Sequence, residues 1–183
     1  MAWAAWAPIA TTRMREPRPA ASYAEAMARV AALMALDGPE VYPASRTRFL
    51  GHGARTGRAL VLFHGYTNSP CQFARLGELL HARGDNVLIP RAPHHGLAHR
   101  LTTAHGRLRA EELVAMADEA VDIARGLGER VTVAGLSMGG VMAAWAAQER
   151  ADVDRAVLIA PAFGFRVVPA AVTPLAAALL RRL

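Results

Sequence analysis

The sequence predicts an α/β fold, with a mostly parallel sheet and helices on both faces. From residue 59 onward, short apolar runs rich in β-branched residues alternate with longer segments of helical periodicity, and the links between them are short. The chain has 183 residues, of which 53% are apolar, and this suffices for one domain with a hydrophobic core.

The first 44 residues precede this alternation and differ from it. Residues 8–21 are rich in Pro, Arg and Ala without a hydrophobic period, so we expect nothing there to pack and residues 1–21 to form a flexible or anchor-proximal segment. Residues 22–38 predict a surface helix, because Ser22 is a suitable N-cap with Glu25 three residues later. With its linker, this helix covers residues 22–44.

The remaining elements follow in order. Residues 46–53 alternate enough for a short strand, and apolar runs typical of strands buried in a parallel sheet occur at 59–65, 86–90, 130–136 and 155–160. Amphipathic segments between these runs predict helices at 69–84, 110–128 and 138–150. This β-α-β-α-β-α-β order predicts the parallel sheet.

The charged residues and the cysteine exclude several kinds of chemistry. All 21 basic residues are arginine, so no lysine is present for a phosphate-binding loop, a Schiff base or a Ser-Lys dyad. The net charge is +6, but the arginines are scattered and only Arg181 and Arg182 are adjacent. We therefore expect no nucleic-acid partner. One cysteine, Cys71, provides neither an internal disulfide nor a CxxC motif.

The N-terminal ten residues are apolar but too few to span a bilayer, and they lack the basic region of a signal peptide. A cytoplasmic location is expected. The alternative is a membrane anchor whose start lies upstream, since Arg13, Arg15 and Arg18 follow as at the cytoplasmic end of such an anchor. Membrane contact is expected only through that anchor.

The stretch VTVAGLSMGG, residues 131–140, joins a predicted strand to a predicted helix through Ser137. A tight turn there brings the residues two before and two after the serine almost into contact, which explains glycine at Gly135 and Gly139. The hydroxyl then projects above the sheet at the helix N-terminus, as a nucleophile would. The plainer alternative is an N-cap serine with two packing glycines.

A second candidate loop, FHGYTNSP at residues 63–70, follows the strand at 59–65. The carboxyl ends of parallel strands meet at one edge of a sheet, so this loop can direct backbone amides to the space above Ser137. We assign the two donors of an oxyanion hole to the amides of Tyr66 and Met138. His64 and Gly65 support the loop, or they form an ordinary turn.

The motifs LFHGYTNSP, PRAPHHGLA and VAGLSMGG, in this order and spacing, resemble the α/β-hydrolase fold and its carboxylesterase and monoacylglycerol-lipase-like branch. The resemblance implies a serine nucleophile, Ser137, with Tyr66 and Met138 as oxyanion donors, a small acyl or ester substrate, no metal and no organic cofactor. It covers about residues 45–165, a partial domain that lacks the last strands, and makes residues 166–183 the start of a lid region.

The chain departs from the family order of serine, then acid, then histidine. All seven histidines precede Ser137: His52, His64, His81, His94, His95, His99 and His105. The acids after it are Glu149, Asp152 and Asp154. The two aspartates precede the strand at 155–160, so we expect them about 20 Å from the catalytic edge as solvated charges. His64 or His95 as a substitute base is less favoured.

Two further interpretations concern the histidines and the last predicted strand. A metal site at His94, His95 and His99 is less favoured than the polar rim of a pocket. Residues 155–160 form an apolar edge strand with no charge inside it after Arg155, and this strand is exposed when no strand follows.

We therefore expect a fragment or truncated product of a serine hydrolase acting on carboxylic esters or related acyl compounds through an acyl-serine. The alternative is a non-catalytic remnant that binds a ligand or a partner.

Overall fold

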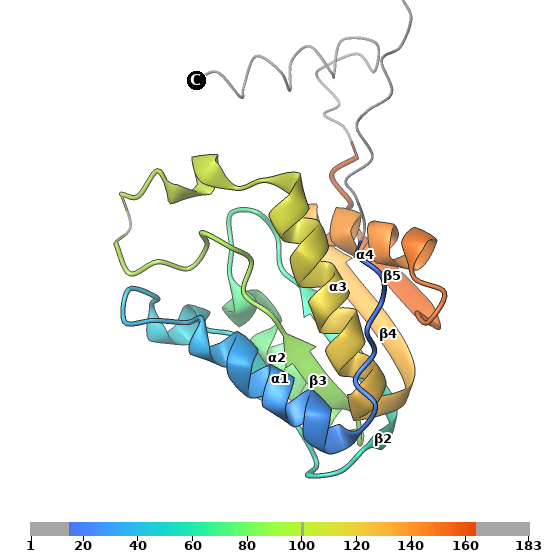
Figure 1. The fold of residues 1–183 in the computed structure, drawn as a ribbon. Coiled ribbons are helices and arrows are strands. Elements are labelled where there is room, and N and C mark those ends of the chain that lie inside the picture. Colours follow the sequence, from blue (N-terminus) through green and yellow to red (C-terminus); the bar gives the residue numbers. More distant parts are fainter. Residues whose placement is uncertain (1–14, 100, 164–183) are drawn as a thin grey trace, which may run out of the picture.

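The computed structural model describes residues 15–99 and 101–163, and a five-stranded sheet forms its centre (Figure 1). The strands are β1 (Arg48–Leu50), β2 (Thr56–Phe63), β3 (Asn86–Ile89), β4 (Gly128–Leu136) and β5 (Arg155–Ile159), in the spatial order β1-β3-β2-β4-β5. β1 is antiparallel to β3, and the other neighbouring pairs are parallel. The predicted mostly parallel sheet is confirmed.

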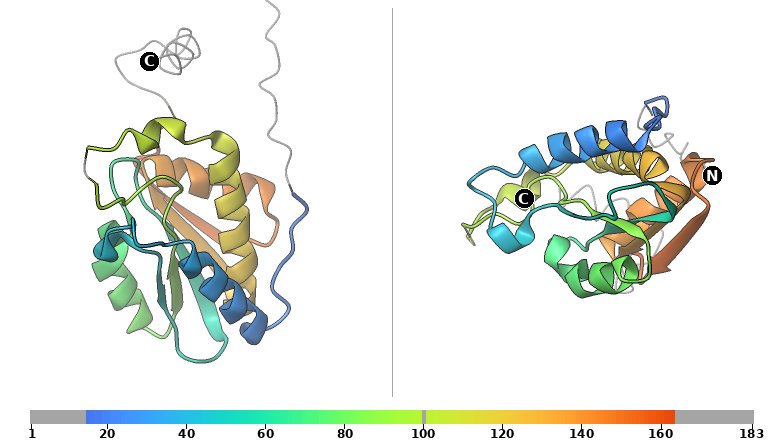
Figure 2. Two further views of the ribbon diagram at one scale, coloured as in Figure 1. Left: turned by 60° about the vertical axis from the view of Figure 1, so that its left-hand side comes forward. Right: turned by 90° about the horizontal axis from the view of Figure 1, so that it is seen from below.

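Helices cover both faces of this sheet (Figure 2). The α-helices are α1 (Tyr23–Ala35), α2 (Ala74–His81), α3 (Ala110–Leu127) and α4 (Met138–Glu149), and short 3-10 turns occur at η1 (Pro43–Ser45), η2 (Pro70–Phe73) and η3 (Ala104–Arg107). α1, α3 and α4 share one core with the sheet, and α2 lies on the opposite face. The predicted helices on both faces are also confirmed.

The strand β2 is buried on both faces, and its side chains alternate between two cores. Ala59, Val61 and Phe63 pack in the larger core with α1, α3 and α4, whereas Leu60 and Leu62 pack in the smaller core beside α2. This alternation explains why β2 is a continuous apolar run rather than a polar and apolar repeat.

The segment before α1 corrects one expectation. Residues 15–21 lie along α3: Arg15 pairs with Asp122 at 2.7 Å, and the backbone amides of Arg18 and Ala20 donate to Asp122 as well. The prediction of a flexible segment over residues 1–21 is therefore wrong for 15–21, because backbone pairing with a distant helix leaves no hydrophobic period. Residues 1–14, including the predicted anchor-proximal part, lie outside the described residues. The predicted N-cap is confirmed, since Ser22 Oγ accepts from the Glu25 amide at 3.1 Å.

β5 is an edge strand within the part of the chain that the structure describes, since it pairs there with β4 alone. Its apolar side chains Val157, Leu158 and Ile159 are 38–43% exposed. No helix among residues 15–99 and 101–163 has the length and apolar character needed to cross a membrane. The predicted lid region at 166–183 lies outside the described residues.

Candidate active site at the carboxyl edge of the sheet

Ser137 is the single residue between β4, which ends at Leu136, and α4, which begins at Met138. Its backbone has φ 56° and ψ −115°, a conformation that costs a non-glycine residue on the order of 1–3 kcal/mol. The Ser137 amide donates to the Ile159 carbonyl at 3.0 Å, and the Val141 amide donates to the Ser137 carbonyl at 3.1 Å. Neighbouring backbone thus holds the serine in a strained turn at the carboxyl end of β4.

Glycine is required on both sides of this turn. A Cβ on Gly135 would overlap the carbonyl group of Gly139, and a Cβ on Gly139 would overlap the Phe63 carbonyl oxygen. The first overlap is the crowding expected from the sequence. The second shows that Gly139 also sets how closely α4 approaches β2.

The loop after β2 reaches the same edge as Ser137. β2 and β4 are parallel neighbours with Phe63 opposite Gly135, so Tyr66 and Met138 each lie three residues past that pair. Among the described residues, neither the Tyr66 nor the Met138 amide donates a hydrogen bond.

His64 fixes the loop that carries the Tyr66 amide. Its Nε2 accepts from the Ala92 amide at 3.0 Å, so Nδ1 carries the proton and donates to the Gly65 carbonyl at 2.9 Å. Burial lowers the pKa of His64 from 6.5 to about 4, which keeps the ring neutral at pH 7. With both nitrogens engaged by backbone, His64 is not free to take a proton from Ser137.

Three side-chain hydrogen bonds beside this loop were not predicted from the sequence. The Gln72 Oε1 accepts from the Gly65 amide at 2.8 Å, and the Tyr66 hydroxyl donates to the His105 carbonyl at 3.3 Å. Arg91 donates to the His95 carbonyl at 3.0 Å and so supports the loop that follows β3. Tyr66 lies in LFHGYTNSP and Arg91 in PRAPHHGLA, but neither motif indicates these hydrogen bonds, and Gln72 follows the first motif by two residues.

The histidines of HHGLAH point in different directions. His94 Nε2 lies 3.0 Å from Glu112 Oε1, whereas the His95 ring is buried with its edge toward His64 and His105. His95 Nδ1 donates to the Pro93 carbonyl at 2.7 Å, and burial lowers the pKa of this ring. His99 is exposed. Within the described ranges, no three His, Cys, Asp or Glu side chains are placed to hold a metal.

The acids after Ser137 lie at the opposite edge of the sheet. Asp154 Oδ2 accepts from the Val131 amide at 2.7 Å, at the amino end of β4. Asp152 accepts two hydrogen bonds, at 2.9 and 2.8 Å, from Arg150, whose side chain is fully buried. The expected location is confirmed, but the description of Asp152 as a solvated charge is wrong, because it neutralises a buried guanidinium. Glu149 is exposed.

Solved structures with this fold include a lipase and an esterase. A monoacylglycerol lipase from Paleococcus ferrophilus is 22% identical, with a TM-score of 0.57, over 74% of this chain and 50% of its own. The Pyrococcus furiosus esterase Pf2001 is 20% identical, with a TM-score of 0.50, over 74% of this chain and 55% of its own. The chain thus spans about half the length of these structures.

A search of curated proteins gives no match. The family model Hydrolase_4, described as serine aminopeptidase, S33, matches residues 54–183, which include β2, the Tyr66 loop, Ser137 and α4. This match covers more than half of the chain and agrees with the order of strands and helices around Ser137. The chain therefore belongs to the S33 family of α/β hydrolases.

Proposed function

We propose that this protein is a serine hydrolase of carboxylic esters or related acyl compounds, with Ser137 as its nucleophile. The strained turn carries this proposal, because it presents one hydroxyl beside two backbone amides without acceptors, those of Tyr66 and Met138. An acyl carbonyl placed there meets a nucleophile and the two donors that a developing oxyanion needs.

The reaction divides into two acyl transfers. The Ser137 Oγ attacks the acyl carbon and gives its proton to a base, and the carbonyl oxygen becomes an oxyanion held by the two amides. The alcohol then departs with a proton, and water hydrolyses the acyl-serine to a carboxylate. No metal or organic cofactor takes part in the proposed reaction. His64, Gly65, Gly135 and Gly139 serve as positioning residues.

Neither His64 nor His94 is assigned as the base for this reaction. His64 uses both ring nitrogens on backbone groups, and His94 contacts Glu112. No side chain in the described part of the chain is hydrogen-bonded to Ser137. We propose that the histidine and the acid come from polypeptide outside that part.

Labelling with a fluorophosphonate tests the proposal on the full gene product. The probe phosphonylates an activated serine, so we expect labelling that maps to Ser137 and is absent in Ser137→Ala. Gly139→Ala should reduce labelling at least tenfold, because its Cβ displaces the turn from β2. Gly57→Ala is the matched control, since a Cβ there meets no atom within 4 Å. An unlabelled Ser137 in folded wild-type protein would falsify the proposal.

A non-catalytic role is the second candidate, and the exposed β5 edge favours it. Val157, Leu158 and Ile159 form an apolar strand edge of the kind that pairs with another chain. In that case the 183-residue chain should be soluble and unfold cooperatively. An insoluble or molten product would contradict this role, and phosphonylation of Ser137 would favour the enzyme.

A further inference from the structure

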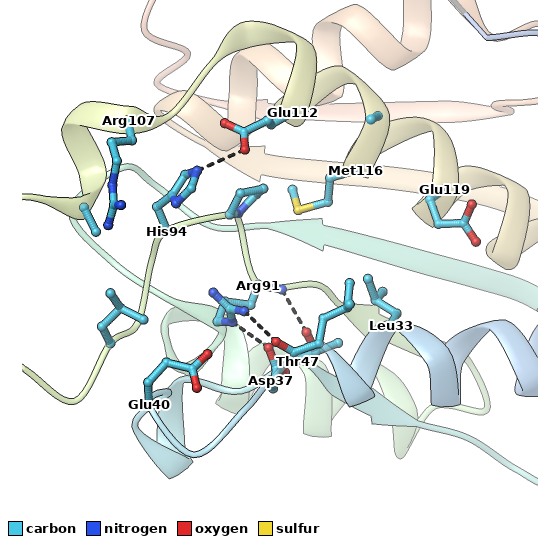
Figure 3. A pocket seen from close by; sticks show the side chains of 15 residues that line it. Leu33, Asp37, Glu40, Thr47, Arg91, His94, Arg107, Glu112, Met116 and Glu119 are labelled. Carbon is cyan, nitrogen blue, oxygen red and sulfur yellow. Dashed lines mark hydrogen bonds and ion pairs between the residues drawn. The ribbon is translucent and has the colours of Figure 1, made fainter.

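A cavity of about 640 Å³ lies apart from Ser137, between α1, α3 and the loop after β3 (Figure 3). Its volume falls within the range of about 300–1,000 Å³ that small-molecule sites occupy. Ser137, Tyr66, Met138 and His64 are absent from its lining. A ligand in this cavity would therefore bind independently of the Ser137 hydroxyl.

The walls of the cavity are largely apolar. Leu33 and Leu36 contribute from α1 and its C-terminal end, Met116 from α3, and Pro93 and Leu97 from the loop after β3. Leu36 is 69% exposed, so an apolar side chain of the wall still faces solvent. An aliphatic chain in the cavity would remove such surface from water, which contributes roughly 25 cal/mol per Å².

Three acidic side chains of the lining already have partners. Asp37 pairs with Arg91 at 2.5 Å, and Glu112 contacts His94 at 3.0 Å. Glu119 pairs with Arg29 at 2.8 Å. A ligand therefore meets mostly neutralised charge along this cavity.

Two charged side chains of the lining, Glu40 and Arg107, are exposed and have no ion pair in the described part of the chain. They have opposite signs and lie at the end of the cavity where His94 also lies (Figure 3). An anionic head group would be attracted by Arg107 and repelled by Glu40. A cationic head group would be attracted by Glu40 and repelled by Arg107. A head group with hydroxyls satisfies both, because hydroxyls donate to the carboxylate and accept from the guanidinium.

We propose that this cavity binds an uncharged amphiphile, an aliphatic chain that carries a hydroxylated head group. The chain lies against Leu33, Leu97 and Met116, and the head group lies between Glu40 and Arg107. This site is separate from the proposed catalytic function and does not depend on it.

Calorimetric titration with three ten-carbon probes tests the head-group chemistry: 1,2-decanediol, decanoate and decyltrimethylammonium, each below the concentration at which it aggregates. The diol should bind at least tenfold more tightly than either charged probe. Arg107→Glu should shift the preference toward decyltrimethylammonium, and Glu40→Arg toward decanoate. Equal affinities of the three probes for wild-type protein would overturn the proposal.

Two variants locate the binding. Ala115 is exposed on α3 and lines the cavity, so Ala115→Trp should fill it and weaken diol binding at least tenfold. The matched control is Ala147→Trp, which makes the same change at an exposed position of α4 outside the cavity. Equal loss in both variants, or none in Ala115→Trp, places the diol elsewhere and overturns the proposal.

Ser137→Ala separates this site from the catalytic proposal. The variant should bind the diol with unchanged affinity while it loses fluorophosphonate labelling. If diol binding disappears in Ser137→Ala, the probe occupies the catalytic edge and the cavity proposal fails. If wild-type protein binds the diol but Ser137 is never labelled, the catalytic proposal fails alone.

Discussion

The two ends of α4 have opposite effects on the stability of the fold. At its start, Ser137 lies in a strained backbone turn with close glycine contacts and a neutral, buried His64 nearby. At its end, Arg150 is fully buried among Asp118, Asp122 and Asp152. The strained turn at the first end lowers stability and exposes one hydroxyl, whereas the ion pairs at the second end join three segments.

The charge network extends from Arg150 to the N-terminal segment. Asp122 also receives Arg15 and Arg29, so one carboxylate links that segment, α1, α3 and the residue that follows α4. Hydrogen bonds from Arg29 hold the pKa of Glu119 below its usual value. Burial alone would raise the pKa of Asp152, but the hydrogen bonds and the charge of Arg150, together with smaller contributions from a backbone hydrogen bond and Arg125, lower it below its usual value. Glu119 and Asp152 therefore stay ionised to a lower pH than free carboxyl groups of the same kind.

The largest expected effect is at the charged end. Arg150→Met removes the counter-charge of two buried aspartates and should lower the free energy of unfolding by about 3–5 kcal/mol, measured by urea unfolding at pH 7. Arg155→Met is the control, and its exposed side chain should change stability by less than about 0.5 kcal/mol. Similar values for the two variants would show that the buried network is dispensable.

The neutral end should control part of the pH dependence. The pKa of His64 is about 4 in the folded protein and 6.5 when exposed, so the unfolded chain takes up the proton first. The contribution of neutral His64 to the free energy of unfolding is therefore complete above pH 6.5. It is lost as the pH falls toward 4, by about 3 kcal/mol in all. The free energy of unfolding, measured with urea between pH 4.5 and 7, should change less with pH in His64→Asn than in the wild-type protein. The exposed His99 provides the control His99→Asn. An equal pH dependence in all three proteins would contradict the assignment.

The two ends also differ in how well sequence predicts them. Gly135, Ser137 and Gly139 lie within five residues, so their steric relation can be read locally between a strand and a helix. Arg150 is 28 and 32 residues from Asp122 and Asp118, and no spacing rule joins an arginine after one helix to acids inside another. The packing of residues 15–21 was missed for the same reason, because its partner Asp122 is more than 100 residues away.

The strain at Ser137 predicts a smaller change of opposite sign. Ser137→Gly relieves a positive φ that serine adopts at a cost, so the free energy of unfolding should rise by about 1 kcal/mol while labelling is lost. Ser69→Gly is the control, since Ser69 has an extended backbone with φ −149° and gains nothing from glycine. Destabilisation by Ser137→Gly in urea unfolding would mean that the turn is not strained.

The smallest expected effect is at the edge of the charge network. Arg15 is 44% exposed, and Asp122 keeps Arg29 and Arg150 when Arg15 is lost, so Arg15→Ala should lower the free energy of unfolding by about 0.5 kcal/mol. Hydrogen exchange of the Arg18 and Ala20 amides should nevertheless accelerate, because the segment loses the Arg15 side chain as an attachment to α3 and keeps the bonds of these two amides to Asp122. Arg75→Ala, on an exposed pair of α2, should leave that exchange unchanged. A loss above about 2 kcal/mol in Arg15→Ala would mean that Arg15, rather than Arg150, is the main counter-charge of Asp122, since only the removal of a principal buried partner has so large an effect.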